Sequence, residues 1–189
     1  MSKDKQRLLE IIREKSVAYG EFTLVSGMKS NYYIDGKMTT FDPEGASEVG
    51  KLMLKTIKSL PRKVDSVGGP TMGADPIVTA VGIEAFRQKD SFRCFAVRKK
   101  TKEHGRQKLI EGNFIKGDRV VIVEDVITTG GSIFQSIDAV EESGGAVEAV
   151  IVVVDRMQGG KENLAEKGYT LFSLFTIDEI LEKDKLPKQ

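Results

Sequence analysis

The sequence predicts an α/β fold: a central, mostly parallel sheet flanked by helices. From residue 64 onward, short apolar runs alternate with segments of helical periodicity, as in successive β–α units. Residues 147–154 are dominated by Val and Ile, which indicates a strand that helices bury on both faces. Residues 119–123 form a similar strand that leads into two acids and a Thr/Gly turn. Sheets of this kind bind ligands at that end of their strands.

The first sixty residues follow a different pattern. A helix is predicted over about residues 5–18, where Leu8 and Ile12 belong to an apolar face, and a second helix starts at the Asp-Pro-Glu of residues 42–44. Residues 22–35, between these helices, are interpreted as a β-hairpin-like hood outside the main sheet. We therefore expect one domain over residues 1–189, with N-terminal helices and hood to about residue 60 and an α/β core from about 61.

The remaining elements follow in order along the core. Strands are predicted at residues 64–67, 92–97, 119–123, 147–154 and 171–175. A helix begins near Asp75, interpreted as its N-cap because Pro76 would then occupy the first helical position. Gly144 and Gly145 close the helix before the fourth strand. Thr176 and Glu179 form a capping box for a C-terminal helix.

Composition excludes several classes of protein. Lys and Arg number 29 against 28 Asp and Glu, a net charge of +1, which argues against nucleic-acid binding. The single cysteine, Cys94, cannot form an internal disulfide, so a reducing compartment is expected. No apolar run is long enough to span a bilayer, and the N-terminus lacks the apolar stretch of a secretion signal. We expect a cytoplasmic protein without a membrane partner.

The stretch from residue 120 to residue 132 carries the most chemical information. A turn rich in Thr and Gly opens a helix, and the N–H groups at a helix N-terminus favour a phosphate. Glu124 and Asp125 would repel a phosphate alone, but carboxylates accept hydrogen bonds from vicinal hydroxyls or bind a divalent cation. A phosphorylated sugar meets all of these demands. An ordinary strand-to-helix turn with solvated acids is the alternative.

This stretch resembles the signature of type I phosphoribosyltransferases, which bind phosphoribosyl pyrophosphate (PRPP). The resemblance implies the type I phosphoribosyltransferase fold. It also implies that Glu124 and Asp125 bind the ribose hydroxyls, that Asp125 is catalytic, and that the turn binds the 5′-phosphate. The residues expected to bind PRPP here are Glu124, Asp125, Val126, Ile127, Thr128, Thr129, Gly130, Gly131 and Ser132.

A basic loop is predicted over residues 98–108. It holds six basic residues and one acid in eleven positions and lacks apolar periodicity. A solvated surface loop would explain a bare charge run, but a departing pyrophosphate also needs cationic compensation.

The loop resembles the catalytic loop of orotate phosphoribosyltransferases, which closes over the neighbouring subunit's site. The resemblance implies a homodimer in which Arg98, Lys99, Lys102 and His104 contact the pyrophosphate in trans, with Lys102 and His104 catalytic.

Further segments extend the resemblance to the base and to the pyrophosphate. It implies that Tyr32 and Tyr33 lie beside the pyrimidine, although core aromatics would give the same pattern. Arg156 would pair bidentately with the orotate carboxylate, for which a planar guanidinium is well shaped, and Thr128 would also touch the base. Residues 69–73 correspond to the family's pyrophosphate turn.

The chain departs from some family members at two positions. Where those members carry a lysine, this sequence has Val25 before the Ser-Gly of the hood and Met72-Gly73 in the pyrophosphate turn. Both departures remove a cation from the substrate site. Whether another residue compensates for them is left open by the sequence.

The resemblance implies transfer of ribose 5-phosphate from PRPP to orotate, giving orotidine 5′-monophosphate and pyrophosphate in pyrimidine (UMP) biosynthesis. Mg²⁺ is expected as cofactor, carried by the substrate with no dedicated protein site, since no cage of His, Cys or clustered acids is visible. A phosphoribosyltransferase for another base and a non-catalytic PRPP-binding regulator are the alternatives.

Overall fold

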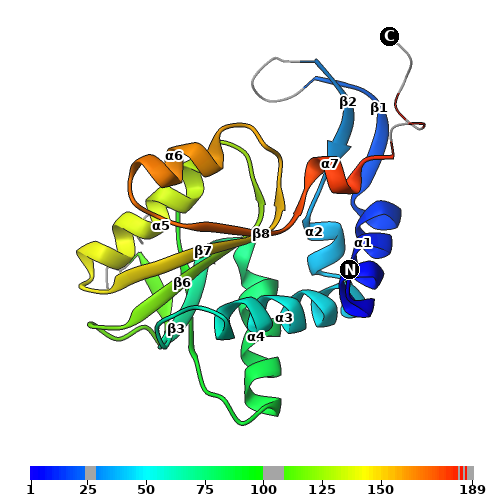
Figure 1. Cartoon of the computed structure of the whole chain (residues 1–189). Helices are drawn as coiled ribbons and strands as arrows, with labels where there is room; N and C mark the ends of the chain where they lie inside the picture. The colour runs from blue at the N-terminus through cyan, green and yellow to red at the C-terminus, as the bar shows by residue number, and fades with distance from the viewer. Residues whose placement is uncertain (24–28, 100–108, 183, 185, 187–189) are drawn as a thin grey trace.

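The computed structural model describes residues 1–23, 29–99, 109–182, 184 and 186 (Figure 1). The strands are β1 Val17–Thr23, β2 Lys29–Ile34, β3 Ser66–Pro70, β4 Arg93–Val97, β5 Ile110–Gly112, β6 Arg119–Ile127, β7 Ala146–Asp155 and β8 Leu171–Thr176. The helices are α1 Lys3–Lys15, α2 Lys37–Thr40, α3 Pro43–Lys58, α4 Ala74–Arg87, α5 Gly131–Glu142, α6 Gly160–Glu166 and α7 Ile177–Ile180.

The predicted α/β fold is confirmed. Six strands form a sheet in the order β5-β4-β3-β6-β7-β8, parallel except for the edge strand β5, which pairs antiparallel with β4. The hood is confirmed as well, because β1 and β2 pair only with each other, in a separate antiparallel sheet that stands beside the main one (Figure 1). The carboxyl ends of β3, β4, β6 and β7 therefore meet at one edge of the sheet.

Two apolar layers enclose the central strands. On one face, Val121 and Val123 of β6 pack into a core shared with α1, α3 and α4; on the other, Val120 and Ile122 pack against α5 and α6. Successive residues of a strand point to opposite faces, so a strand between two helical layers must be apolar at every position. The Val/Ile runs of β6 and β7 meet that requirement, and they hold the polar residues that follow them in fixed positions.

One irregularity sets the register of these two strands. Val120 pairs with Val147 and Val121 with Ala149, so β7 contains one extra residue at Glu148 relative to β6. Beyond this bulge the ladder is regular as far as Ile127, which pairs with Asp155.

The bounds of one predicted helix and the N-cap of another differ from the prediction. The helix predicted over residues 5–18 runs from Lys3 to Lys15, because the Ser2 hydroxyl caps it by accepting from the Lys5 N–H at 3.3 Å. Its last predicted residues instead form the start of β1. Helix α4 has Gly73, not Asp75, at its N-cap, so Asp75 lies in the first turn, where an acid also favours a helix.

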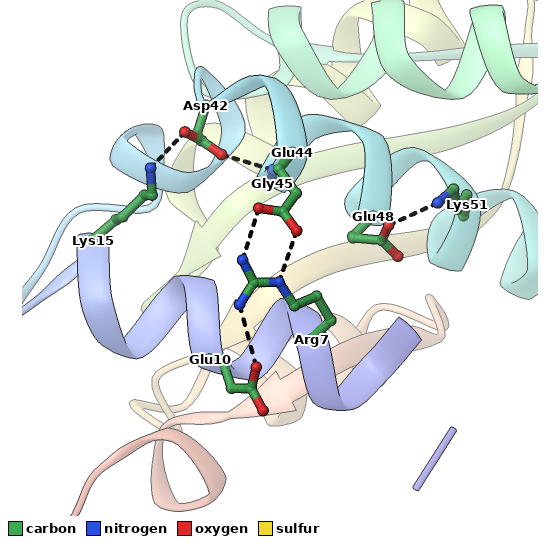
Figure 2. A network of polar contacts seen from close by, with 8 residues as sticks. All are labelled: Arg7, Glu10, Lys15, Asp42, Glu44, Gly45, Glu48 and Lys51. Atoms are coloured by element: carbon green, nitrogen blue, oxygen red, sulfur yellow. Dashed lines mark hydrogen bonds and ion pairs between the residues drawn. The ribbon is translucent and has the colours of Figure 1, made fainter. Parts of the chain in front are cut away.

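The start of α3 is confirmed, and polar contacts tie it to α1 (Figure 2). The Asp42 carboxylate accepts from the Gly45 N–H at 2.9 Å and from Lys15 Nζ at 2.6 Å. Arg7 of α1 donates to both carboxylate oxygens of Glu44, at 2.7 and 2.8 Å. These contacts hold the N-terminal helix against the helix that follows the hood.

The strand that carries the acids is longer than predicted. It was expected to end at residue 123, but β6 continues through Glu124 and Asp125 to Ile127. The elements α2, β5 and α6 were not predicted, because they span only 4, 3 and 7 residues. The capping box of Thr176 and Glu179 is present at α7. No helix in the described part of the chain is long and apolar enough to cross a membrane.

Candidate active site

The turn between β6 and α5 forms an open cradle of backbone at a helix N-terminus. Gly130 has φ +92°, a left-handed conformation that glycine adopts without strain, and it lets the chain enter the twelve-residue helix α5 at once. Nothing lies within 4 Å of where a side chain on Gly131 would begin, so the turn is open on that side. Val126 and Ile127 direct their side chains into the two apolar cores, so their backbone is what faces a ligand. The helix dipole and free N–H groups suit an anion.

Glu124 and Asp125 lie immediately before this cradle, with only 6% and 7% of their surfaces exposed. Val126 N–H donates to Asp125 at 2.8 Å, and the Ser132 hydroxyl donates to Glu124 at 3.3 Å. Burial, together with the neighbouring charge of Asp125, raises the pKa of Glu124 well above its ordinary value. Two buried carboxylates held this closely favour a ligand that supplies hydrogen-bond donors, such as a vicinal diol.

Two glycines bring other segments onto the acids. A side chain at Gly73, in the turn after β3, would collide with the carboxylates of Glu124 and Asp125. A Cβ atom at Gly36, after β2, would lie 2.9 Å from the Cβ of Asp125. The residue that follows Gly36, Lys37, places Nζ 3.9 Å from Asp125 Oδ2 and 2.8 Å from Asp35 Oδ1. Lys37 was not predicted as a site residue, since nothing in the sequence links the hood to β6.

Arg156 follows β7, the strand next to β6. Its backbone N–H donates to the Ile127 carbonyl at 3.0 Å, so the backbone of Arg156 is fixed to the start of the turn between β6 and α5, here called the phosphate turn for its expected ligand. Its side-chain atoms Nε and Nη2 are buried and have no hydrogen-bond partner among the described residues. The guanidinium carbon lies 5.4 Å from the centre of the Tyr32 ring. A guanidinium with two buried, unpartnered nitrogens beside an aromatic face is suited to a flat anionic ligand.

The structure brings Tyr32, but not Tyr33, to Arg156. The two residues are neighbours on β2 and point to opposite sides of the hairpin. Tyr33 is 46% exposed, and its ring lies 5.7 Å from that of Phe22. The role predicted for Tyr33 stays a prediction.

The segment from Asp155 to α6 packs against the backbone carbonyls of the turn between β6 and α5. A Cβ atom at Gly160 would lie 2.6 Å from the Thr128 carbonyl oxygen, so the two backbones meet closely. The Asn163 side chain on α6 donates to the Thr129 carbonyl at 2.9 Å. Asn163 was not predicted either, because α6 itself was not.

Of the predicted basic loop, only Arg98 and Lys99 belong to the described residues; Lys102 and His104 lie outside them. Arg98 N–H donates to the Leu109 carbonyl at 2.9 Å, and its guanidinium lies 3.6 Å from Glu111. Lys99 is exposed. The loop therefore leaves and rejoins the sheet at the carboxyl end of β4, on the edge that carries the acids.

A parallel sheet whose carboxyl edge brings together an open helix N-terminus and a pair of buried acids suits a phosphorylated sugar. The family model described as "Phosphoribosyl transferase domain" matches residues 40–179 of this chain. An orotate phosphoribosyltransferase of Aquifex aeolicus is 40% identical over 181 residues, 94% of this chain and 98% of the relative. One from Methanocaldococcus jannaschii is 45% identical over 177 residues, 93% and 96%. The chain belongs to the phosphoribosyltransferases and, within them, to the orotate phosphoribosyltransferase family.

The likeness extends to solved structures. The crystal structure of Mycobacterium tuberculosis orotate phosphoribosyltransferase in complex with PRPP has a TM-score of 0.79 to this chain at 33% identity. The match covers 94% of this chain and 98% of that one.

Proposed function

We propose that this protein transfers the ribose 5-phosphate group from PRPP to N1 of orotate, giving orotidine 5′-monophosphate and pyrophosphate. Arg156 carries the choice of base: its two buried, unpartnered nitrogens beside Tyr32 can bind a carboxylate in the plane of an aromatic ring. A base without a carboxylate would leave these donors unpaired, which disfavours its binding. The PRPP complex of the relative supports the choice of the second substrate.

The sugar end of the reaction depends on positioning. Glu124 and Asp125 accept from the two ribose hydroxyls, while the turn from Thr128 to Ser132 holds the 5′-phosphate on the N-terminus of α5. The phosphate and the hydroxyls together hold carbon 1 of the ribose towards the base. This carbon passes through an oxocarbenium-like state as its bond to pyrophosphate breaks.

Positive charge then stabilises the departing pyrophosphate. We assign this role to Arg98, Lys99, Lys102 and His104, with Lys102 contributing most to turnover. Mg²⁺, if bound to PRPP, would neutralise part of the charge on the diphosphate oxygens. The acids of the site, Glu124 and Asp125, are two rather than the three or more of a dedicated metal cage, and no such cage occurs among the described residues.

A homodimer would let the loop act across subunits. An apolar hollow between α3 and α4 is lined by Phe41 and Ile83, which are 59% and 49% exposed. Met72, beside Gly73 of the site, is 61% exposed. We infer that a second copy of the chain covers these exposed apolar side chains.

Cys94, a free thiol, fits a cytoplasmic location.

The first test is the ultraviolet absorbance of orotate when protein, PRPP and Mg²⁺ are combined, with uracil, hypoxanthine and adenine in parallel. Consumption of orotate alone is expected. Release of pyrophosphate with a different base would discard the role of Arg156 and retain the sugar site. Binding of PRPP without turnover of any base would point to a regulator.

The trans arrangement has its own test. Inactive Lys102→Ala dimers are mixed with inactive Asp125→Asn dimers and allowed to exchange subunits. If the loop completes the partner's site, each mixed dimer contains one site without a defect, so about a quarter of all sites should recover. Absence of recovery after verified exchange would refute the trans assignment.

A further inference from the structure

Lys37 is a cation that the hood brings to the sugar-binding acids. It follows Gly36, whose missing side chain allows the segment after β2 to approach Asp125. Its ammonium lies 3.9 Å from Asp125 and 2.8 Å from Asp35, and its side chain is 45% exposed. The hydrogen bond that Lys37 donates to Asp35 raises the pKa of Lys37, which keeps the ammonium charged. One side of this charge is therefore occupied by acids, and the other is accessible.

The position of Lys37 relates to the lysines that this chain lacks. In the turn after β3, a side chain on Gly73 would run against Glu124 and against Asp125 Oδ1. Lys37 approaches the other oxygen of the same carboxylate, Oδ2, from the start of α2, just after the hood. A positive charge is thus present at one of the same two acids, Asp125, although the turn itself contributes none.

On the basis of the proposed function, we propose that Lys37 is a PRPP-binding residue that contacts the substrate's diphosphate and substitutes for the cation missing from the turn at Gly73. PRPP brings several negative charges to a site whose nearest side chains are two carboxylates. A cation between the diphosphate and the carboxylates reduces the repulsion that the acids would otherwise exert on the substrate. Lys37 can retain its contact with Asp125 while its exposed side receives the diphosphate.

A purely structural role is the rival explanation. Lys37 could serve only to pair with Asp35 and so hold the end of the hood. The Asp35→Asn variant separates the two roles. It removes the negative charge of Asp35 but keeps a side-chain oxygen that can accept from the Lys37 backbone N–H, as Asp35 Oδ1 does at 3.1 Å in the wild-type protein. If Lys37 binds substrate, Asp35→Asn should leave the KM for PRPP unchanged or lower it.

The experiment compares Lys37→Met, Lys37→Arg and Asp35→Asn with Lys58→Met as matched control. Lys58 has a similar exposure of 40% and its own ion pair with Asp90 at 2.6 Å, but it lies at the far end of α3. Calorimetry measures the binding of PRPP and of inorganic pyrophosphate, each with Mg²⁺ and without orotate. Lys37→Met should weaken both about tenfold, the loss of one charge-assisted contact in a partly exposed site. Lys37→Arg should recover most of that loss, and the KM for orotate should change little.

Equal losses in Lys37→Met and Asp35→Asn would overturn the proposal, as would unchanged binding in Lys37→Met. The readout does not depend on the base. If the wild-type protein turns over no base but Lys37→Met still weakens pyrophosphate binding, the proposed function fails and the role of Lys37 stands. Failure of the wild-type protein to bind PRPP at all would overturn both.

Discussion

Arg7 on α1 donates to both oxygens of Glu44 on α3, whereas Arg156 leaves two buried guanidinium nitrogens without a partner among the described residues. The acids of the two regions, Glu44 and Glu124, also differ in the direction of their pKa shifts. Arg7 lowers the pKa of Glu44, while burial and a neighbouring acid raise the pKa of Glu124. Charges that join the helices are paired on the surface (Figure 2), and charges at the edge of the sheet are buried and poorly compensated.

The difference in pairing distinguishes charged groups that stabilise the fold from charged groups that are available to bind a ligand. A paired surface charge adds a little stability and no binding. A buried charge without a partner is destabilising in the free protein, and a ligand that supplies the partner recovers that free energy as affinity. Substitutions in the two regions should therefore act on stability with opposite signs.

The largest effect is expected from Arg156→Met. Loss of a bidentate, charge-assisted contact should reduce kcat/KM for orotate roughly a hundredfold. The melting temperature of the ligand-free protein should stay the same or rise, because two buried donors without a partner have been removed. Steady-state kinetics and calorimetry check the two halves, with Arg156→Lys as the control that keeps charge without the fork. A marked loss of stability would assign Arg156 to the fold instead.

Glu124→Gln should reduce kcat/KM for PRPP by about tenfold or more and stabilise the free protein. A carboxyl group whose pKa is raised by folding binds more protons in the folded state than in the unfolded state. Its contribution to stability is therefore greatest at low pH and is lost as pH rises towards the raised pKa. The melting temperature of the variant should exceed that of the wild type by a margin that grows with pH. A margin independent of pH would contradict this account of Glu124.

Asn163→Ala should have a smaller effect, confined to the phosphate. The hydrogen bond from Asn163 holds the Thr129 carbonyl away from the turn, and in a planar trans peptide this also sets the direction of the Gly130 N–H. Its loss should raise the KM for PRPP about three- to tenfold with little change in the KM for orotate. Lys161→Ala, an exposed position on the same helix, is the control. Equal changes in both KM values would indicate a general loosening of the site.

The smallest effect should come from Glu44→Gln on the α1–α3 contact. Because Arg7 lowers the pKa of Glu44, this carboxylate stabilises the fold above its ordinary pKa, and the contribution is lost as pH falls. The variant should show a small fall in melting temperature at neutral pH that disappears in acid, with unchanged kinetics. A change in either KM would mean that the contact between these helices reaches the site.

The sequence predicted the elements whose signals are local. The Val/Ile runs of β6 and β7 need two apolar layers, and Thr176 with Glu179 caps α7 through residues three apart. The turn between β6 and α5 was predicted for the same reason, since its acids, hydroxyls and glycines are consecutive, while its role in binding a phosphate stays a prediction. Asp75 misled because an acid favours both the N-cap and the first helical turn.

The residues that were missed depend on contacts between distant segments. Lys37 lies 88 positions before Asp125 in the chain (125 − 37). The two residues meet only after the hood folds onto the edge of the sheet. Asn163 lies on a helix of seven residues, too short to show a periodic pattern. The unpaired state of Arg156 is likewise a property of its surroundings.

The bulge at Glu148 has a consequence for where β7 places the residues that follow it. Arg156 and the turn after β6 extend from neighbouring strands, so the register of β6 against β7 sets the distance between them. The extra residue at a bulge is left unpaired, so deletion of Glu148 should keep the pairing of Val121 with Ala149 and of Ile127 with Asp155, and leave Arg156 in place. Deletion of a residue between Ala149 and Asp155 should instead move Arg156 along β6 by about 3.3 Å, and orotate binding measured on the two deletions would separate these cases.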